Sequence, residues 1–395
     1  MNQKKYGKTL LAGYFGFITQ AISANFLPLL YVTFRVTYHL SLTQIALFSA
    51  VFFFTQLCVD ALCVRVVDRI GYRPCILVSQ ITSAAGLAGL AILPDLLPSA
   101  YCGIMICVVV YAIGSGLIEV LCSPIIEACP FENKEGTMSF LHSFYCWGFA
   151  GVVLLSTLFF AVFGIENWRI LALLWSLVPL FNVYNFAVCP IETLVDDTER
   201  MTLKELLKTK TFWLFMLLMI AAGASEVSMA QWASAFAESA LHVSKATGDL
   251  IGPCGFAVCM GISRALFGKC SNRINLSVYI TVCGISSFVC YLVAGLAGYP
   301  ILGLTGCALC GFFVGIMWPG SLSISSASLP KGGTALFAFL ALAGDLGASV
   351  GPSVVGAVSQ NANNDLQAGV LAGAVFPLLL LISVLLIRKV GRRAE

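Results

Sequence analysis

Apolar stretches of about 20 residues recur along the whole chain, and their length limits the possible folds more than any other feature. A helix of about 20 residues matches the roughly 30 Å hydrocarbon core of a lipid bilayer. Most of the connections between these stretches are short. The pattern predicts an all-α membrane protein with twelve transmembrane helices, at residues 10–34, 43–66, 74–94, 99–128, 137–163, 168–188, 212–239, 246–268, 274–297, 299–328, 333–360 and 367–388.

The low content of charged residues excludes a soluble protein of this size. Only 10% of the 395 residues are charged and 59% are hydrophobic, whereas soluble domains carry about 25% charged and about 45–50% apolar residues. The net charge of +3 is small, and no basic tract is interleaved with aromatic residues. We therefore expect the lipid bilayer as the surroundings, no nucleic-acid partner, and a monomer.

One long polar segment, Pro190 to Thr211, separates six spans from another six. We expect an N-terminal six-helix bundle at residues 1–189, a cytoplasmic linker at 190–211 and a C-terminal six-helix bundle at 212–395. If the N-terminus is cytoplasmic, 18 of the 22 lysines and arginines lie on the cytoplasmic side. Because positive residues accumulate there, we expect a multi-pass protein of the plasma membrane with both termini in the cytoplasm.

The connection between the second and third spans carries the sharpest local pattern. A short turn with an acid, several arginines and a glycine can lock helix ends together by charge pairing. The sequence reads Asp60 and then Arg65-Val-Val-Asp68-Arg69-Ile70-Gly71-Tyr72-Arg73-Pro74.

This pattern resembles the loop signature of the major facilitator superfamily, Gly-x-x-x-Asp-Arg-x-Gly-Arg-Arg. Val64 stands at its first glycine and Tyr72 at the first residue of its final pair. A half-repeat stands about 200 residues later, where the second of two related halves would carry it: Gly261-Ile-Ser-Arg264-Ala-Leu-Phe-Gly268-Lys269. The alternative is a solvated basic loop without a gating role. The residues to which we assign gating are Asp60, Asp68, Arg69, Gly71, Arg73 and Arg264.

Other segments resemble the fucose permease branch of this superfamily, which consists of sugar–proton symporters. They are Gly114-Ser-Gly116-Leu-Ile-Glu119, Leu141-His142-Ser-Phe-Tyr145, Trp318-Pro319-Gly320 and Gly344-Asp345-Leu-Gly347, while Trp168-Arg169 is similar to an outer pair of the family. The resemblance covers nearly the whole chain. It implies two pseudo-symmetric six-helix bundles that move a small polar solute.

An ionisable side chain inside a span costs about 2.5–3.5 kcal/mol by insertion scales, so each needs a reason. Three acids lie deep in their spans, and a buried carboxyl group can exchange a proton near neutral pH. Glu119 is the first proton-coupling candidate, because the fucose permease branch carries an acid in its fourth span. A buried, hydrogen-bonded carboxyl group without a coupling role is the alternative for Glu119. The other two candidates are Glu226 and Asp345, for which the alternative is a purely structural role, such as pairing of Asp345 across helices.

Amide and aromatic side chains within the spans suit a sugar, because amides bind hydroxyl groups and the apolar face of a sugar ring lies on an indole. Amides also hold helices together, and tryptophan anchors helices at the membrane interface. The substrate-binding candidates are Gln20, Asn25, Gln56, His142, Tyr145, Gln231, Trp232 and Trp318, and Asn182 and Asn185 belong to the same class of polar residues.

The chain lacks the motifs of enzymes and of ATP-driven pumps. It has no G-x-x-x-x-G-K-[ST] phosphate loop and no H-E-x-x-H pattern, so we expect no catalytic residue, metal or cofactor. The leading hypothesis is a proton-coupled transporter of a small solute, a sugar, by alternating access. The alternatives are a multidrug or metabolite–proton exporter and a non-transporting membrane sensor. Sodium coupling and uniport are also compatible with the sequence.

Overall fold

The computed structural model describes residues 3–40, 42–192, 201–239, 250–296, 298–363 and 365–391. Within these ranges the regular structure is helical, with no strand. Ten helical segments of the described chain are long and apolar enough to cross a membrane. The other two predicted spans correspond to α4 (Tyr72–Leu90), which carries Arg73 and Gln80, and to the 16-residue α12 (Gly255–Cys270). Each of the twelve predicted spans therefore overlaps at least one helix, and residues 246–249 of the eighth lie outside the described residues.

The chain divides into two compact units. Unit 1 comprises Met1–Phe131 and Phe144–Asp196, and unit 2 comprises Glu132–Ser143 and Asp197–Glu395. Helix α7 (Lys134–Phe163) belongs to both, because its first turns cluster with unit 2 and the remainder with unit 1. The predicted boundaries at residues 189 and 212 stay a prediction.

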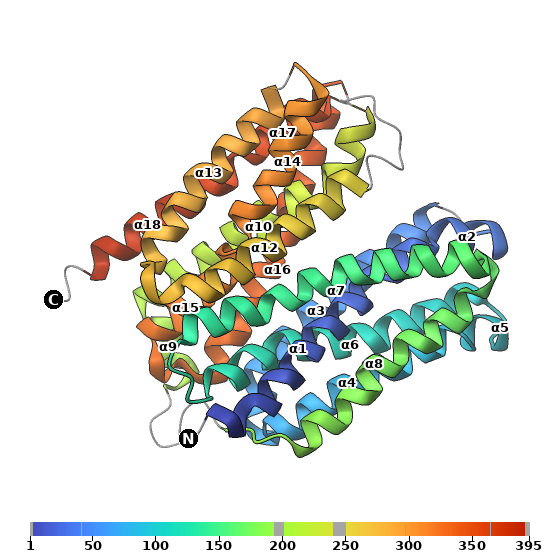
Figure 1. Cartoon of the computed structure of the whole chain (residues 1–395), viewed down its shortest axis with the longest axis horizontal. Helices are drawn as coiled ribbons and strands as arrows, with labels where there is room; N and C mark the ends of the chain where they lie inside the picture. The colour runs from blue at the N-terminus through green and yellow to red at the C-terminus, as the bar shows by residue number, and fades with distance from the viewer. Residues whose placement is uncertain are drawn as a thin grey trace. The chain divides into compact units, whose positions relative to one another are not determined.

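In unit 1, α4 packs against both α6 and α8, and α1 also packs against α6 and α8 (Figure 1). Helix α3 packs against α6 on another side. Short segments join these helices: η1 (Leu27–Leu30), α2 (Tyr31–Thr37), α5 (Leu93–Leu96) and η2 (Ile165–Asn167). The long helices are α1 (Gln3–Asn25), α3 (Leu42–Ile70), α6 (Ala100–Glu127) and α8 (Trp168–Val188).

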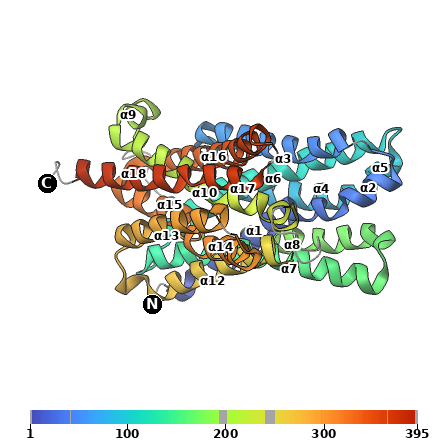
Figure 2. The same ribbon diagram turned by 90° about the horizontal axis from the view of Figure 1, so that it is seen from above.

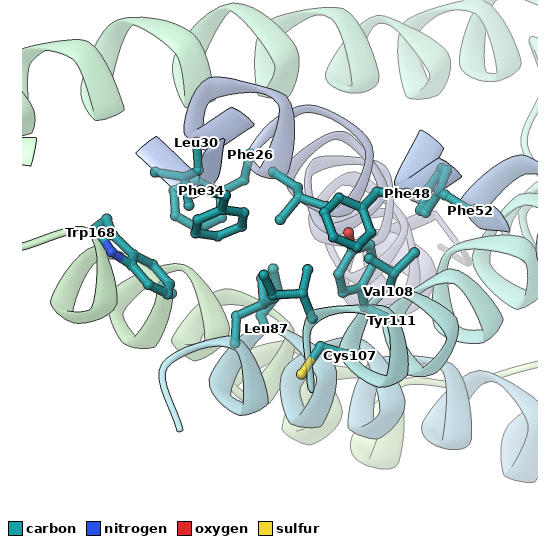
Figure 3. Close-up of a cluster of buried hydrophobic side chains, with 14 of the residues drawn as sticks. Phe26, Leu30, Phe34, Phe48, Phe52, Leu87, Cys107, Val108, Tyr111 and Trp168 are labelled. Atoms are coloured by element: carbon teal, nitrogen blue, oxygen red, sulfur yellow. The ribbon is translucent and has the colours of Figure 1, made fainter. Parts of the chain in front are cut away.

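A cluster of large side chains fills one end of unit 1, where the end of α1 and the beginnings of α3, α6 and α8 meet (Figure 3). Phe34 meets Trp168 edge to face, with ring centroids 5.0 Å apart. Both side chains are almost completely buried. In a bilayer, such close van der Waals packing, and not escape from water, holds helices together.

In unit 2, α10 (Lys210–Ser239) packs along α16 (Gly333–Asn361) and also contacts α18, as Figure 2 shows. Glycines on α16 let the two backbones touch, because a Cβ atom on Gly347 would collide with the carbonyl oxygen of Ile220. The remaining helices are α9 (Leu203–Lys208), α13 (Leu276–Leu296), α14 (Pro300–Val314), α15 (Met317–Ser328), α17 (Leu366–Gly373) and α18 (Val375–Gly391), with the π-helical segment η3 (Leu250–Cys254) and the 3₁₀ turns η4 (Ser271–Arg273) and η5 (Pro330–Gly332).

Three predicted spans are interrupted helices. The first, predicted at 10–34, changes at Phe26 into a 3₁₀ turn that contains Pro28, and then into α2. The tenth is interrupted between α14 and α15, and the twelfth between α17 and α18. In both of these, a proline stands four residues after a glycine at the interruption, Pro319 after Gly315 and Pro377 after Gly373. Proline removes a helical hydrogen bond, and glycine weakens the helix further.

Candidate functional site

In unit 1, Glu119 of α6 is held by amide groups from two other helices. Its Oε2 accepts a hydrogen bond from Gln20 Nε2 of α1 at 2.9 Å and another from Gln56 Nε2 of α3 at 3.1 Å. Both glutamines are buried, at 7% and 3% exposure, and Glu119 is half-buried. The structure thus brings together one proton-coupling candidate and two substrate-binding candidates.

Glycine in α6 makes this arrangement possible. A Cβ atom on Gly116 would lie 3.1 Å from a side-chain carbon of Val59 and 3.3 Å from Gln56 Cα, so α3 runs close to α6 here. This proximity allows the Gln56 amide to reach Glu119 one turn further along α6. The amide also lies 3.4 Å from Ser115 Oγ.

A second polar layer in unit 1 joins α1, α4 and α8. Gln80 Oε1 accepts from Asn182 Nδ2 at 3.3 Å and from Thr19 Oγ1 at 3.4 Å, and Asn182 Nδ2 also donates to the Ala12 carbonyl at 3.0 Å. Gln80, Thr19 and Asn182 are completely buried. Sequence reasoning missed Gln80, although an amide in the middle of the third span was a usable signal. Asn25 donates within α1, to the Ala21 carbonyl.

In unit 2, Glu226 of α10 and Arg264 of α12 form a buried ion pair. Arg264 Nη2 lies 2.9 Å from Glu226 Oε2, and the side chains are 3% and 14% exposed. The sequence suggested separate roles for the two residues, a gating arginine and a deeper coupling acid. The structure places them in contact. Arg264 also donates to the backbone carbonyls of Gly315 and His142.

The beginning of α7 packs along α12 within unit 2. Ser139 Oγ donates to the Arg264 carbonyl at 2.8 Å, and the side chains of Asn133 and Ser271 are hydrogen-bonded. Between these contacts, a Cβ atom on Gly268 would lie 2.9 Å from Phe140 Cβ, so the two helices approach closely. The second half of the predicted repeated motif therefore lies at a helix–helix contact.

The first half of that motif ends a helix. Gly71 separates α3 from α4 with a φ of +94°, a left-handed conformation that favours glycine. Arg73 then donates three hydrogen bonds of 2.7–2.8 Å to the carbonyls of Phe186, Ala187 and Cys189. These carbonyls end α8 without a helical donor, and a cation is favourable at that end of the helix dipole.

The other predicted gating residues are placed differently. Asp60 is completely buried in α3, and Arg69 is exposed at the end of the same helix. The side chain of Asp68 lies outside the part of the chain that the structure describes.

The remaining candidates lie on α7, α10, α15 and α16. The Trp318 ring packs on Gly344, beside the half-buried Asp345, and Trp232 Nε1 donates to the Pro352 carbonyl at 2.9 Å. Both tryptophans join helices of unit 2. Gln231 is exposed, Tyr145 is half-buried on α7, and His142 is 5% exposed.

A second arginine–carboxylate pair lies at an exposed edge of unit 1. Arg169 Nη2 lies 2.6 Å from Asp95 Oδ2, with side-chain exposures of 34% and 55%. Tyr38 donates to Asp95 at 3.0 Å and accepts from Arg169 at 2.9 Å. Burial, with a smaller contribution from Asp95, raises the pKa of Tyr38 to about 12. Sequence reasoning identified Arg169 through its Trp-Arg pair and missed Asp95.

Comparison with known proteins identifies the family of this chain. A model of the Major Facilitator Superfamily matches residues 13–352. A search of curated proteins by sequence gave no match. The described residues contain no group of three or more His, Cys, Asp and Glu side chains that could hold a metal ion.

Several solved structures have the same fold. The chain is similar to the Major Facilitator Superfamily transporter FucP in the outward conformation, with a TM-score of 0.82 and 15% identity over 97% of this chain and 99% of that one. A second FucP structure, described as the E. coli fucose:proton symporter, gives a TM-score of 0.81 at 15% identity with the same coverage. The proton:xylose symporter XylE bound to 6-bromo-6-deoxy-D-glucose gives 0.84 at 13% identity over 98% and 96%.

At these identities the likeness concerns the fold alone, and it confirms the predicted twelve-helix architecture. The fold is one of transporters and not of enzymes. The apolar helices make the protein a multi-pass membrane protein. Because the family model matches most of its length, the chain belongs to the Major Facilitator Superfamily.

Proposed function

We propose that this protein imports a small polar solute, a sugar, together with protons, by alternating access between its two six-helix bundles. Glu119 is the proton-coupling residue. The observation that carries this proposal is the contact of its carboxylate with two buried, neutral amides from separate helices. The solved structures described as fucose:proton and proton:xylose symporters support this solute class and this coupling ion.

Neutral donors suit a group that must gain and lose a proton. When Glu119 is protonated, its amide neighbours Gln20 and Gln56 carry no charge that would remain uncompensated in the membrane. A released amide can instead bind a hydroxyl group of the solute, because each amide both donates and accepts hydrogen bonds. Protonation and solute binding therefore favour each other at one place.

The other residues that we propose as solute contacts are Asn25, Tyr145, His142, Gln231, Trp232 and Trp318. We further propose that the protein acts as a monomer in the plasma membrane, with both termini in the cytoplasm. A terminal tag that antibodies reach on intact cells would contradict this orientation.

The test of the proposed function is Glu119→Gln in proteoliposomes, because glutamine keeps the shape of the protonated acid and cannot release a proton. We expect uphill uptake driven by a proton gradient to be lost, with an accumulation ratio near one. Exchange of labelled for unlabelled solute should persist, because exchange needs no net proton transfer. The matched control is Glu127→Gln, at the end of the same helix and 9% exposed, which should still accumulate solute.

Three results would count against the proposal. Accumulation by the Glu119→Gln variant would remove Glu119 from coupling and direct attention to Glu226 and Asp345. Proton-driven solute efflux, without uptake in the opposite orientation, would indicate an exporter. A solute that binds without crossing the membrane would indicate a sensor.

A further inference from the structure

The tenth span contains a proline that leaves one backbone carbonyl without its helical donor. In an α-helix, the N–H of each residue donates to the carbonyl four residues earlier, and proline has no N–H. Pro319 therefore cannot donate to the carbonyl of Gly315. The helix is interrupted there, between α14 and α15, and resumes at once, because Gly320 N donates to the Ile316 carbonyl at 2.8 Å.

Arg264 of α12 donates to this carbonyl in place of the proline. Its Nε lies 2.7 Å from the Gly315 oxygen, its Nη2 2.9 Å from Glu226 Oε2 and its Nη1 3.2 Å from the His142 carbonyl oxygen. The guanidinium group is 3% exposed. One carboxylate and two backbone carbonyls, from three separate segments of unit 2, thus converge on one positive charge.

These oxygen atoms are of the kind that bind a small, hard metal cation. Carboxylate and backbone carbonyl oxygens are the usual protein ligands of such cations. In several membrane transporters, the carbonyl ends of interrupted helices hold the coupling cation. In this chain the positive charge at the interrupted helix belongs to a side chain and cannot leave.

We propose that Arg264 is a built-in cation at this site and determines the ion specificity of the transporter. Because its guanidinium group occupies the oxygen cluster, Na⁺ does not bind there and does not drive transport. Removal of the side chain would leave an anionic, oxygen-lined site that accepts a cation from solution. The statement about which ion drives uptake rests on the proposed transport function, whereas the statement about Na⁺ binding at this site does not.

The first experiment uses the unaltered protein. Uptake in proteoliposomes is measured at a fixed proton gradient with Na⁺ or with choline, and the melting temperature in detergent is measured in the same two salts. We expect less than about a twofold change in uptake and no shift in melting temperature. A Na⁺-dependent rise of about 3 °C or more in the melting temperature would show cation binding and would overturn the proposal, as would a tenfold loss of uptake in choline.

The two measurements separate failure of this inference from failure of the proposed function. If the protein transports no sugar at all, the proposed function fails, and the melting temperatures still decide whether Na⁺ binds. If it concentrates solute with Na⁺ and not with protons, transport stands and this inference fails.

The second experiment uses Arg264→Ala, which removes the built-in charge and keeps Glu226. We expect a lower melting temperature that 50 mM Na⁺ or methylguanidinium raises by about 3 °C or more. The double variant R264A/E226Q should lose this response, because it lacks the carboxylate. Arg169→Ala removes an arginine from an exposed pair and should show no response. Equal responses of all three variants would overturn the proposal, and if Arg264→Ala does not fold, the experiment on the unaltered protein decides.

Discussion

Each of the two units holds an acid within a membrane-spanning helix, but the partners of the two acids differ. Glu119 of unit 1 accepts hydrogen bonds from two neutral amides, whereas Glu226 of unit 2 is paired with the buried guanidinium group of Arg264. Loss of the charge at Glu226 would remove a carboxylate that neutralises the buried guanidinium group of Arg264. The two amides that contact Glu119 carry no charge, so neither of them is left as an unpaired ion when Glu119 is protonated. The charge of the groups that contact an acid within a membrane-spanning helix thus indicates whether its proton can be exchanged at low cost.

The same substitution at both acids tests this comparison and should give the largest effect. Glu226→Gln should lower the free energy of unfolding by about 3–5 kcal/mol, because the buried guanidinium group of Arg264 loses the carboxylate with which it forms an ion pair. Glu119→Gln should cost about 1 kcal/mol or less, because the new amide oxygen still accepts from Gln20 and Gln56. Thermal and denaturant unfolding in detergent would measure both, and equal losses would contradict the distinction between the two acids.

An intermediate effect on stability is expected at Arg73. Like Arg264, it donates to backbone carbonyls at a helix end. It is only half-buried, however, and its hydrogen-bond partners at the end of α8 include no carboxylate. Arg73→Ala should cost about 1–2 kcal/mol, because three carbonyls lose a charged donor. Arg73→Lys should restore part of this loss, since lysine keeps the charge without the fork of donors. A variant as unstable as Glu226→Gln would show that burial of the arginine is not the deciding factor.

The smallest effect is expected at the exposed pair of Arg169 and Asp95. Its 2.6 Å distance is shorter than that of the buried pair, yet water already solvates both groups. Arg169→Ala should therefore change the stability by less than about 1 kcal/mol. The same unfolding measurement applies, and raising the salt concentration should reduce even this difference. A loss of several kcal/mol would mean that distance matters more than burial in this protein.

The breaks in the helices were partly predictable from the sequence. Pro319 and Pro377 each stand four residues after a glycine at the interrupted point, and Pro28 lies in the turn that interrupts the first span. Pro352 lies inside α16, which continues through it. A proline alone is therefore an insufficient signal, and the backbone freedom of the glycine contributes to the break.

The candidate site was predictable as a set of residues, but not as a set of contacts. Sequence reasoning selected Glu119, Gln20 and Gln56 separately, as a coupling acid and as solute ligands. Gln20 and Glu119 are 99 residues apart in the chain, and no local pattern connects them. Likewise, nothing in the sequence showed that Arg264 would meet Glu226.

The sequence by itself determined that the chain lies in a membrane, where its helices run and to which family its loop motif belongs. These properties follow from the lengths of apolar stretches and from short patterns, which are local along the chain. The tertiary structure alone decided which polar groups meet. Those contacts depend on the rotation of each helix about its axis and on how closely helices approach, which small residues such as Gly116 and Gly268 set through packing.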